Sequence, residues 1–99
     1  MQKRIASYNL EEIKALIEKE RYFVTKSAKL AYVALGLSDE EVIKIIMSLV
    51  HRDLHKSMTS YANNKLWQDV YYKNVDELEL YIKLQINGDA IIISFKERT

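Results

Sequence analysis

The stretch of sequence that decides the fold is ELELYIKLQINGDAIIISFK, residues 77–96. Apolar and polar side chains alternate from Glu77 to Ile86, which is the period of a half-buried antiparallel strand. The apolar set is Leu78, Leu80, Ile82, Leu84 and Ile86, and the polar set is Glu77, Glu79, Tyr81, Lys83 and Gln85. Asn87-Gly88 is typical of a two-residue hairpin turn, so we expect residues 89–96 to form the returning strand.

A two-residue turn also predicts which side chains face each other. The expected pairs on the apolar face are Ile86 with Asp89, Leu84 with Ile91, Ile82 with Ile93, and Leu80 with Phe95. On the opposite face Tyr81 would pair with Ser94 and lie diagonal to Lys96, within reach of long side chains. The hairpin therefore predicts that Tyr81 and Lys96 share the polar face of a sheet.

A further strand is expected upstream, over residues 65–72, and another within residues 53–61. If residues 73–76 form a four-residue loop, Tyr72 pairs with Glu77 and Gln68 lies directly opposite Tyr81. A loop one residue longer or shorter would instead turn Gln68 to the buried side. In the four-residue register Asp69 points toward the apolar face, where its carboxylate requires hydrogen-bond donors.

The first half of the chain has the period of helices. Asn9, Thr25 and Ser38 are placed to cap three helices, and Ser38 with Glu41 has the spacing of a capping box. Gly36 is placed to end the second helix, because glycine tolerates the left-handed backbone. Tyr22-Phe23-Val24 is expected to be a short edge strand. The predicted class is α+β, with N-terminal helices on one face of a twisted, mainly antiparallel C-terminal sheet.

Composition narrows the class of protein further. The chain has 99 residues, 48% of them hydrophobic and 29% charged, which predicts one globular domain over residues 1–99. It has no cysteine, no apolar segment after its basic N-terminus and no run long enough to span a membrane, so we expect a cytoplasmic protein. The net charge is only +1, so an argument for nucleic-acid binding needs a local cluster of basic residues.

The residues alone leave the role of the polar face open. Most tyrosines and lysines on the solvent side of a strand have no catalytic role. Trp67, Tyr71 and Phe95 are expected to pack in the core. His51 and His55 are four residues apart, but they lie where the helical pattern ends and have no evident acidic partner, so no metal site is predicted.

Four separate motifs resemble the MqsR family of toxins. They are KSMTSY at residues 56–61, LWQDVY at 66–71, YIK at 81–83 and ISFKE at 93–97. Their order and spacing match over the whole second half, which is far more specific than one short motif. The resemblance implies that Lys56, Gln68, Tyr81 and Lys96 are the active residues.

The resemblance also implies a fold, an activity and a partner. The fold would be RelE-like, and the activity would be ribosome-independent cleavage of single-stranded mRNA by a metal-free and cofactor-free toxin. The partner would be an antitoxin of the MqsA type, which binds zinc and has a helix-turn-helix. His55 and Tyr72 depart from the family pattern, since an aromatic and a basic residue are expected there. With Lys83 they are the auxiliary or RNA-binding candidates.

A metal-free ribonuclease activates the 2′-OH of its substrate, protonates the leaving 5′-oxygen and surrounds the phosphorus with cations. Lys56 and Lys96 can hold phosphate oxygens, and Gln68 can orient the phosphate or a base. Two neighbouring lysines are expected to lower the pKa of Tyr81 from its reference value of about 10. His55 is a possible auxiliary acid or base.

Two other functions remain open at this point. The chain would be a degenerate module that binds RNA or an antitoxin without cutting, which the acidic Asp76, Glu77 and Glu79 near Tyr81 favour. Alternatively, it would be an interaction domain whose edge strand extends the sheet of a partner.

Overall fold

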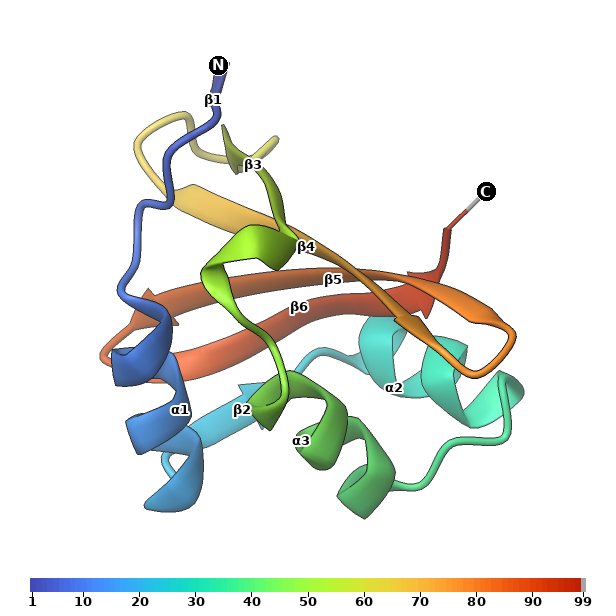
Figure 1. Cartoon of the computed structure of the whole chain (residues 1–99). Helices are drawn as coiled ribbons and strands as arrows, with labels where there is room; N and C mark the ends of the chain where they lie inside the picture. Colours follow the sequence, from blue (N-terminus) through green and yellow to red (C-terminus); the bar gives the residue numbers. More distant parts are fainter. Residues whose placement is uncertain (99) are drawn as a thin grey trace.

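Three helices and six strands follow one another in the computed structural model, which describes residues 1–98 (Figure 1). The helices are α1 (Leu10–Glu18), α2 (Lys26–Ala34) and α3 (Asp39–Met47), and a 3₁₀ turn covers His51–Asp53. The strands are β1 (Gln2–Lys3), β2 (Tyr22–Val24), β3 (Leu54–Thr59), β4 (Trp67–Val75), β5 (Leu78–Asn87) and β6 (Asp89–Glu97). The α+β class is confirmed. None of the helices in residues 1–98 is long and apolar enough to cross a membrane.

The helices begin and end where the sequence supplies caps. The Asn9 side chain accepts hydrogen bonds from the backbone of Glu11 and Glu12, and Thr25 accepts one from Ala28. Ser38 and Glu41 form the predicted reciprocal capping box at the start of α3. Gly36 has a φ of +81° just after α2, so the predicted helix end is confirmed.

The sheet has the strand order β1-β3-β4-β5-β6-β2. All neighbouring pairs are antiparallel except β2, which runs parallel to β6 at one edge of the sheet. The short edge strand predicted at residues 22–24 is therefore confirmed. At the other edge lies β1, a two-residue strand that pattern reading did not predict.

All three helices cover the same face of the sheet (Figure 1). The core between them contains Leu10, Ile13, Ile17, Ala28, Tyr32, Val42, Ile45, Ile46 and Leu49 from the helical half, and Tyr71, Leu80, Ile82, Leu84, Ala90, Ile92 and Phe95 from the strands. Tyr71 and Phe95 are core residues as predicted, whereas Trp67 is only half-buried under Lys3. The opposite face has no helix over it, and we refer to it as the helix-free face.

The predicted register of the last hairpin is wrong by one residue at the turn. The chain reverses about Gly88, which has a φ of +78°, so Asn87 pairs with Asp89 and Ile86 with Ala90. Ala90 and Ile92 therefore enter the core in place of Ile91 and Ile93. A bulge between Lys83 and Leu84 shifts the register again, and Tyr81 lies directly opposite Lys96 rather than diagonal to it.

The predicted loop between β4 and β5 is too long by two residues. Val75 pairs with Leu78, which leaves only Asp76 and Glu77 in the turn, and Asp76 adopts a φ of +54°. Tyr72 rather than Gln68 therefore lies opposite Tyr81. Because the error is an even number of residues, Gln68 keeps the predicted face of the sheet but not the predicted neighbour.

Asp69 is fully buried on the helix side and has the hydrogen-bond donors that its position requires. Its carboxylate accepts hydrogen bonds from the backbone N–H groups of Ser7 and Tyr8 at 2.9–3.0 Å. The Tyr8 hydroxyl donates to the carbonyl of Trp67 at 2.6 Å. These contacts tie the segment between β1 and α1 to the sheet.

Candidate active site

The helix-free face collects all four residues of the predicted active site. Strand pairing puts Lys56 opposite Val70 and Val70 opposite Lys83, while the next row contains Tyr72, Tyr81 and Lys96 in adjacent strands. Gln68 has the same orientation as Val70 and Tyr72, because residues two apart in a strand share a face. The six polar residues come from four neighbouring strands, so the sheet itself fixes their relative positions.

Tyr81 is the centre of this arrangement. The ammonium of Lys96 lies 5.1 Å from the centroid of the Tyr81 ring, and that of Lys83 lies 5.7 Å from it. Burial raises the pKa of Tyr81 above its ordinary value, and neighbouring Tyr72 raises it further. The expectation that the lysines lower this pKa is wrong, because desolvation of the phenolate dominates. Tyr81 is therefore a neutral phenol that can donate a proton.

Lys83 is the half-buried cation of the face. Its pKa is lowered by burial first, and then by repulsion from Lys96 and Lys56. Each of these effects disfavours the charged ammonium. Lys83 is consequently easier to deprotonate than an ordinary lysine, and it lies beside the phenol of Tyr81.

Aromatic rings continue the site from Tyr81 toward β3. The rings of Tyr72 and Tyr81 are 6.1 Å apart, and His55 stacks on Tyr72 at 4.0 Å with an angle of 13° between the planes. A bulge in β3 at His55 accompanies this contact. Burial lowers the pKa of His55, and the charges of Lys56, Arg4 and Arg98 lower it further. His55 is therefore predominantly neutral at pH 7.

Gln68 lies at a distance from the tyrosines. It is four residue positions along β4 from Tyr72, which pairs with Tyr81, and this corresponds to roughly 13 Å at 3.3 Å per strand residue. Its amide donates a hydrogen bond to the Gln85 side chain at 3.2 Å, and both side chains are buried. The alternation in residues 77–86 predicts Gln85 on the solvent face, but the partner amide and its neighbours cover it.

Two basic residues at the rim were missed by pattern reading. Arg98 lies over the Tyr72 ring at 4.4 Å and forms an ion pair with Glu79 at 3.4 Å. Arg4 reaches the site from the bend that follows β1. A strand of two residues is too short to show a period in the sequence, so neither β1 nor Arg4 could be predicted from the pattern.

The face is hollowed beside Tyr81. A depression of about 210 Å³ is lined by Tyr72, Tyr81, Lys96, Glu97 and Arg98. It is open to solvent, and it can hold a phosphate between a phenol and cations. Within residues 1–98, no group of three or more His, Cys, Asp or Glu side chains is placed to hold a metal ion.

A helix-backed sheet with an exposed face of lysines around a neutral tyrosine defines a small α+β protein suited to binding and protonating a phosphodiester. Residues 5–97 match the model of the family described as "Motility quorum-sensing regulator, toxin of MqsA". The chain belongs to this MqsR toxin family. It is 35% identical over 98 residues to the mRNA interferase toxin MqsR of Escherichia coli (strain K12), an alignment that covers 99% of this chain and 100% of that protein.

Proposed function

We propose that this protein is a toxin that cuts mRNA on the helix-free face of its sheet. The observation that carries the proposal is the placement of Tyr81 directly opposite Lys96 and beside Lys83, with Lys56 on the same face. The E. coli relative bears the name of an mRNA interferase. We further propose a RelE-like fold, which the helices packed on one face of a mainly antiparallel sheet support.

The proposed reaction is an attack of the RNA 2′-oxygen on the adjacent phosphorus. The bond from phosphorus to the 5′-oxygen breaks, which leaves a 2′,3′-cyclic phosphate and a free 5′-hydroxyl. Tyr81 donates its phenolic proton to the leaving 5′-oxygen, as its raised pKa favours. Lys96 stabilises the extra negative charge that develops on the oxygens of the cleaved phosphate. Lys56, three strand spacings away on the same face, binds the backbone of the RNA.

Two groups on this face are candidates to accept the proton of the 2′-hydroxyl. Lys83 adjoins the Tyr81 ring, whereas His55 lies one ring further away, stacked on Tyr72. The lowered pKa of Lys83 increases the fraction of its neutral amine, which can accept a proton. This amine lies beside Tyr81, the proposed proton donor. We assign Lys83 as the base that accepts the proton of the 2′-hydroxyl. His55 and Tyr72 are assigned to stacking against bases of the RNA.

The family description names this class as the toxin of MqsA. We propose that an antitoxin of that type, which binds zinc and carries a helix-turn-helix, restrains the protein. The substrate would be single-stranded mRNA in the cytoplasm. The charges of the helix-free face attract a phosphate backbone without requiring a ribosome.

Cleavage by the purified chain tests the proposal. A defined single-stranded RNA is incubated with the protein in EDTA and without ribosomes, and the products are separated by length. Discrete fragments that depend on Lys96 support the ribonuclease. Binding of the RNA without cleavage supports the degenerate module instead. Failure to bind would show that RNA is not the ligand of this face.

A further inference from the structure

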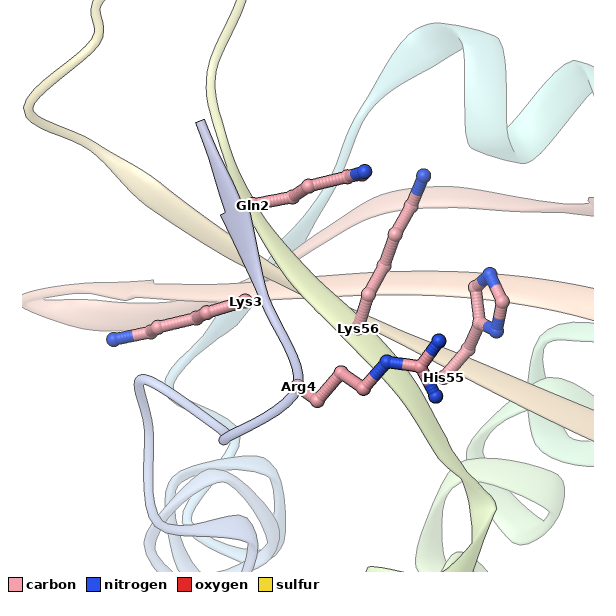
Figure 2. Close-up of a pocket in the computed structure, with 5 residues that line it drawn as sticks. All are labelled: Gln2, Lys3, Arg4, His55 and Lys56. Atoms are coloured by element: carbon pink, nitrogen blue, oxygen red, sulfur yellow. The ribbon is translucent and has the colours of Figure 1, made fainter.

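The N-terminal strand forms a second hollow on the helix-free face. It has a volume of about 330 Å³ and is lined by Gln2, Lys3, Arg4, His55 and Lys56 (Figure 2). Gln2, Lys3 and Arg4 lie outside residues 5–97, which are the part that matches the family model.

The pairing of β1 with β3 decides which side chains enter the hollow. Gln2 pairs with Met58 and Lys3 with Ser57, so Gln2 shares the face of Lys56. Arg4 follows the strand and lines the same hollow. The Lys3 side chain points the opposite way and lies over the Trp67 ring at 4.2 Å. Figure 2 shows Lys3 directed away from Lys56, and Arg4 extended toward His55.

The strand is held in place at each end. The N-terminal amine of Met1 donates a hydrogen bond to the Thr59 hydroxyl at 3.1 Å, and the Thr59 backbone donates to the Met1 carbonyl at 2.9 Å. After Arg4, Ser7 is bound to Ser57 at 2.7 Å and to the buried Asp69 carboxylate. Arg4 directly follows β1 and is therefore held between two anchored points of the chain.

The lining of the hollow is cationic and contains no carboxylate. Neither Arg4 nor Lys56 forms a salt bridge with any Asp or Glu in residues 1–98, whereas Arg98 is paired with Glu79. The charge of Arg4 is close enough to His55 to lower the pKa of that imidazole. Two free cations and an amide around one hollow match the oxygens of a phosphate group.

The hollow is continuous with the proposed active site through Lys56. Lys56 lies opposite Val70, which lies opposite Lys83, so two strand spacings of about 4.8 Å separate the two lysines. An RNA strand bound across Tyr81 and Lys83 would continue along the face toward β1. Its neighbouring phosphate would meet Lys56 and Arg4.

We propose that Gln2, Arg4 and Lys56 form a binding subsite for a phosphate of the RNA strand that flanks the cleaved one. This inference rests on the proposed function for its substrate, and it adds β1 as a part of the RNA-binding surface. Contacts to backbone phosphates carry no sequence information. The subsite therefore contributes affinity and register, and it leaves the choice of cleavage sequence unchanged.

Binding to an RNA that cannot be cut tests the subsite separately from catalysis. The probe is a fluorescent 2′-O-methyl oligonucleotide, and its affinity for the full chain is measured by anisotropy over a series of NaCl concentrations. Arg4→Gln is expected to weaken binding about tenfold and to lower the slope of log K against log salt by about 0.7, the loss of one phosphate contact. The matched control is Lys19→Gln, which removes the same charge from an exposed position at the end of α1, on the helix side of the sheet.

The subsite is overturned if Arg4→Gln and Lys19→Gln have equal affinities and equal salt slopes, or if the wild-type chain does not bind the probe. Far-UV circular dichroism and urea unfolding establish that each variant is folded. If the wild-type chain and both variants cut RNA equally well, the proposed ribonuclease activity is supported and the proposed subsite is rejected. If the chain binds the probe in a way that depends on Arg4 but never cuts RNA, the subsite is supported and the ribonuclease activity is rejected.

Discussion

Tyr81 lies directly opposite Lys96 across the β5–β6 pair, and the Lys96 ammonium is 5.1 Å from the centroid of its ring. A slip of one residue at the hairpin turn and a bulge further along produce this alignment together. A phenol and an ammonium fixed on facing strands need little reorganisation to contact the same phosphate. The catalytic role of each group leads to a separate prediction.

The first prediction concerns the charge of Lys96. Lys96→Ala should lower kcat/KM for RNA by about 100-fold or more, because it removes a cation that stabilises the transition state. The side chain is exposed and is not ion-paired within residues 1–98, so the free energy of unfolding should change by less than about 0.5 kcal/mol. Cleavage rates and urea unfolding curves measure the two effects.

The matched control for Lys96→Ala is Lys19→Ala, an exposed lysine at the end of α1 on the helix side of the sheet. It removes the same charge and should leave cleavage unchanged. A stable Lys96→Ala protein with full cleavage would rule out the assigned role.

The second prediction concerns the proton of Tyr81. Burial raises the pKa of Tyr81 above its ordinary value, so the phenol is protonated at neutral pH and activity should not rise with ionisation of this group. Tyr81→Phe should lose on the order of 100-fold in rate. A substrate with sulfur in place of the leaving 5′-oxygen needs no proton donor and should restore most of that loss. A rate that climbs with pH toward 10 in the wild type but not in Tyr81→Phe would show that Tyr81 acts as a base instead.

The third prediction concerns Gln68, which is bound to Gln85 rather than placed beside Tyr81. Gln68→Leu and Gln85→Leu should each destabilise the fold by about 1–3 kcal/mol, because each leaves a buried amide without its partner. The double variant should be less destabilised than the sum of the two. Urea unfolding of all four proteins gives the coupling energy.

The two glutamine variants should also lose similar amounts of cleavage activity when assayed while fully folded. Cleavage that is abolished in Gln68→Leu but normal in Gln85→Leu would show that Gln68 contacts the substrate directly.

The fourth prediction concerns the buried carboxylate of Asp69. Asp69→Asn should destabilise the protein by about 2 kcal/mol or more, because the charged acceptor of the Ser7 and Tyr8 N–H groups is lost. Asp76→Asn makes the same chemical change at an exposed turn with a φ of +54°, which asparagine tolerates, and should be nearly neutral. Equal stability of the two variants would contradict the role of Asp69 in anchoring the N-terminus.

The helix caps of this protein are predictable from residue type, whereas the register of its strands is not. The caps at Asn9, Thr25 and Ser38 involve only neighbouring backbone groups, so residue type is sufficient to predict them. The class of the fold followed from the change of period between the two halves. The predicted burial of Asp69 requires hydrogen-bond donors, but nothing in the sequence pattern indicates that Ser7 and Tyr8 supply them.

The strand register could not be predicted from the sequence, because tertiary packing decides where turns and bulges form. Asp76 adopts a left-handed backbone, and the loop is two residues shorter than the four-residue loop considered from the sequence. Ala90 is drawn into the core beside β2, where its N–H donates to the Arg21 carbonyl. The strand β1 is held in place by its pairing with β3. Neither this strand nor Arg4, which follows it and lines the hollow, therefore has a local signature in the sequence.

The most direct test of the central claim uses an RNA in which one nucleotide, the one that supplies the attacking oxygen, lacks its 2′-hydroxyl. The account predicts that the wild-type protein, in EDTA, cuts the unmodified RNA to a 2′,3′-cyclic phosphate and a 5′-hydroxyl, and leaves that bond intact in the modified RNA. Cleavage of the modified bond, or products with a 5′-phosphate, would contradict a reaction in which Tyr81 and Lys96 assist attack by the 2′-oxygen.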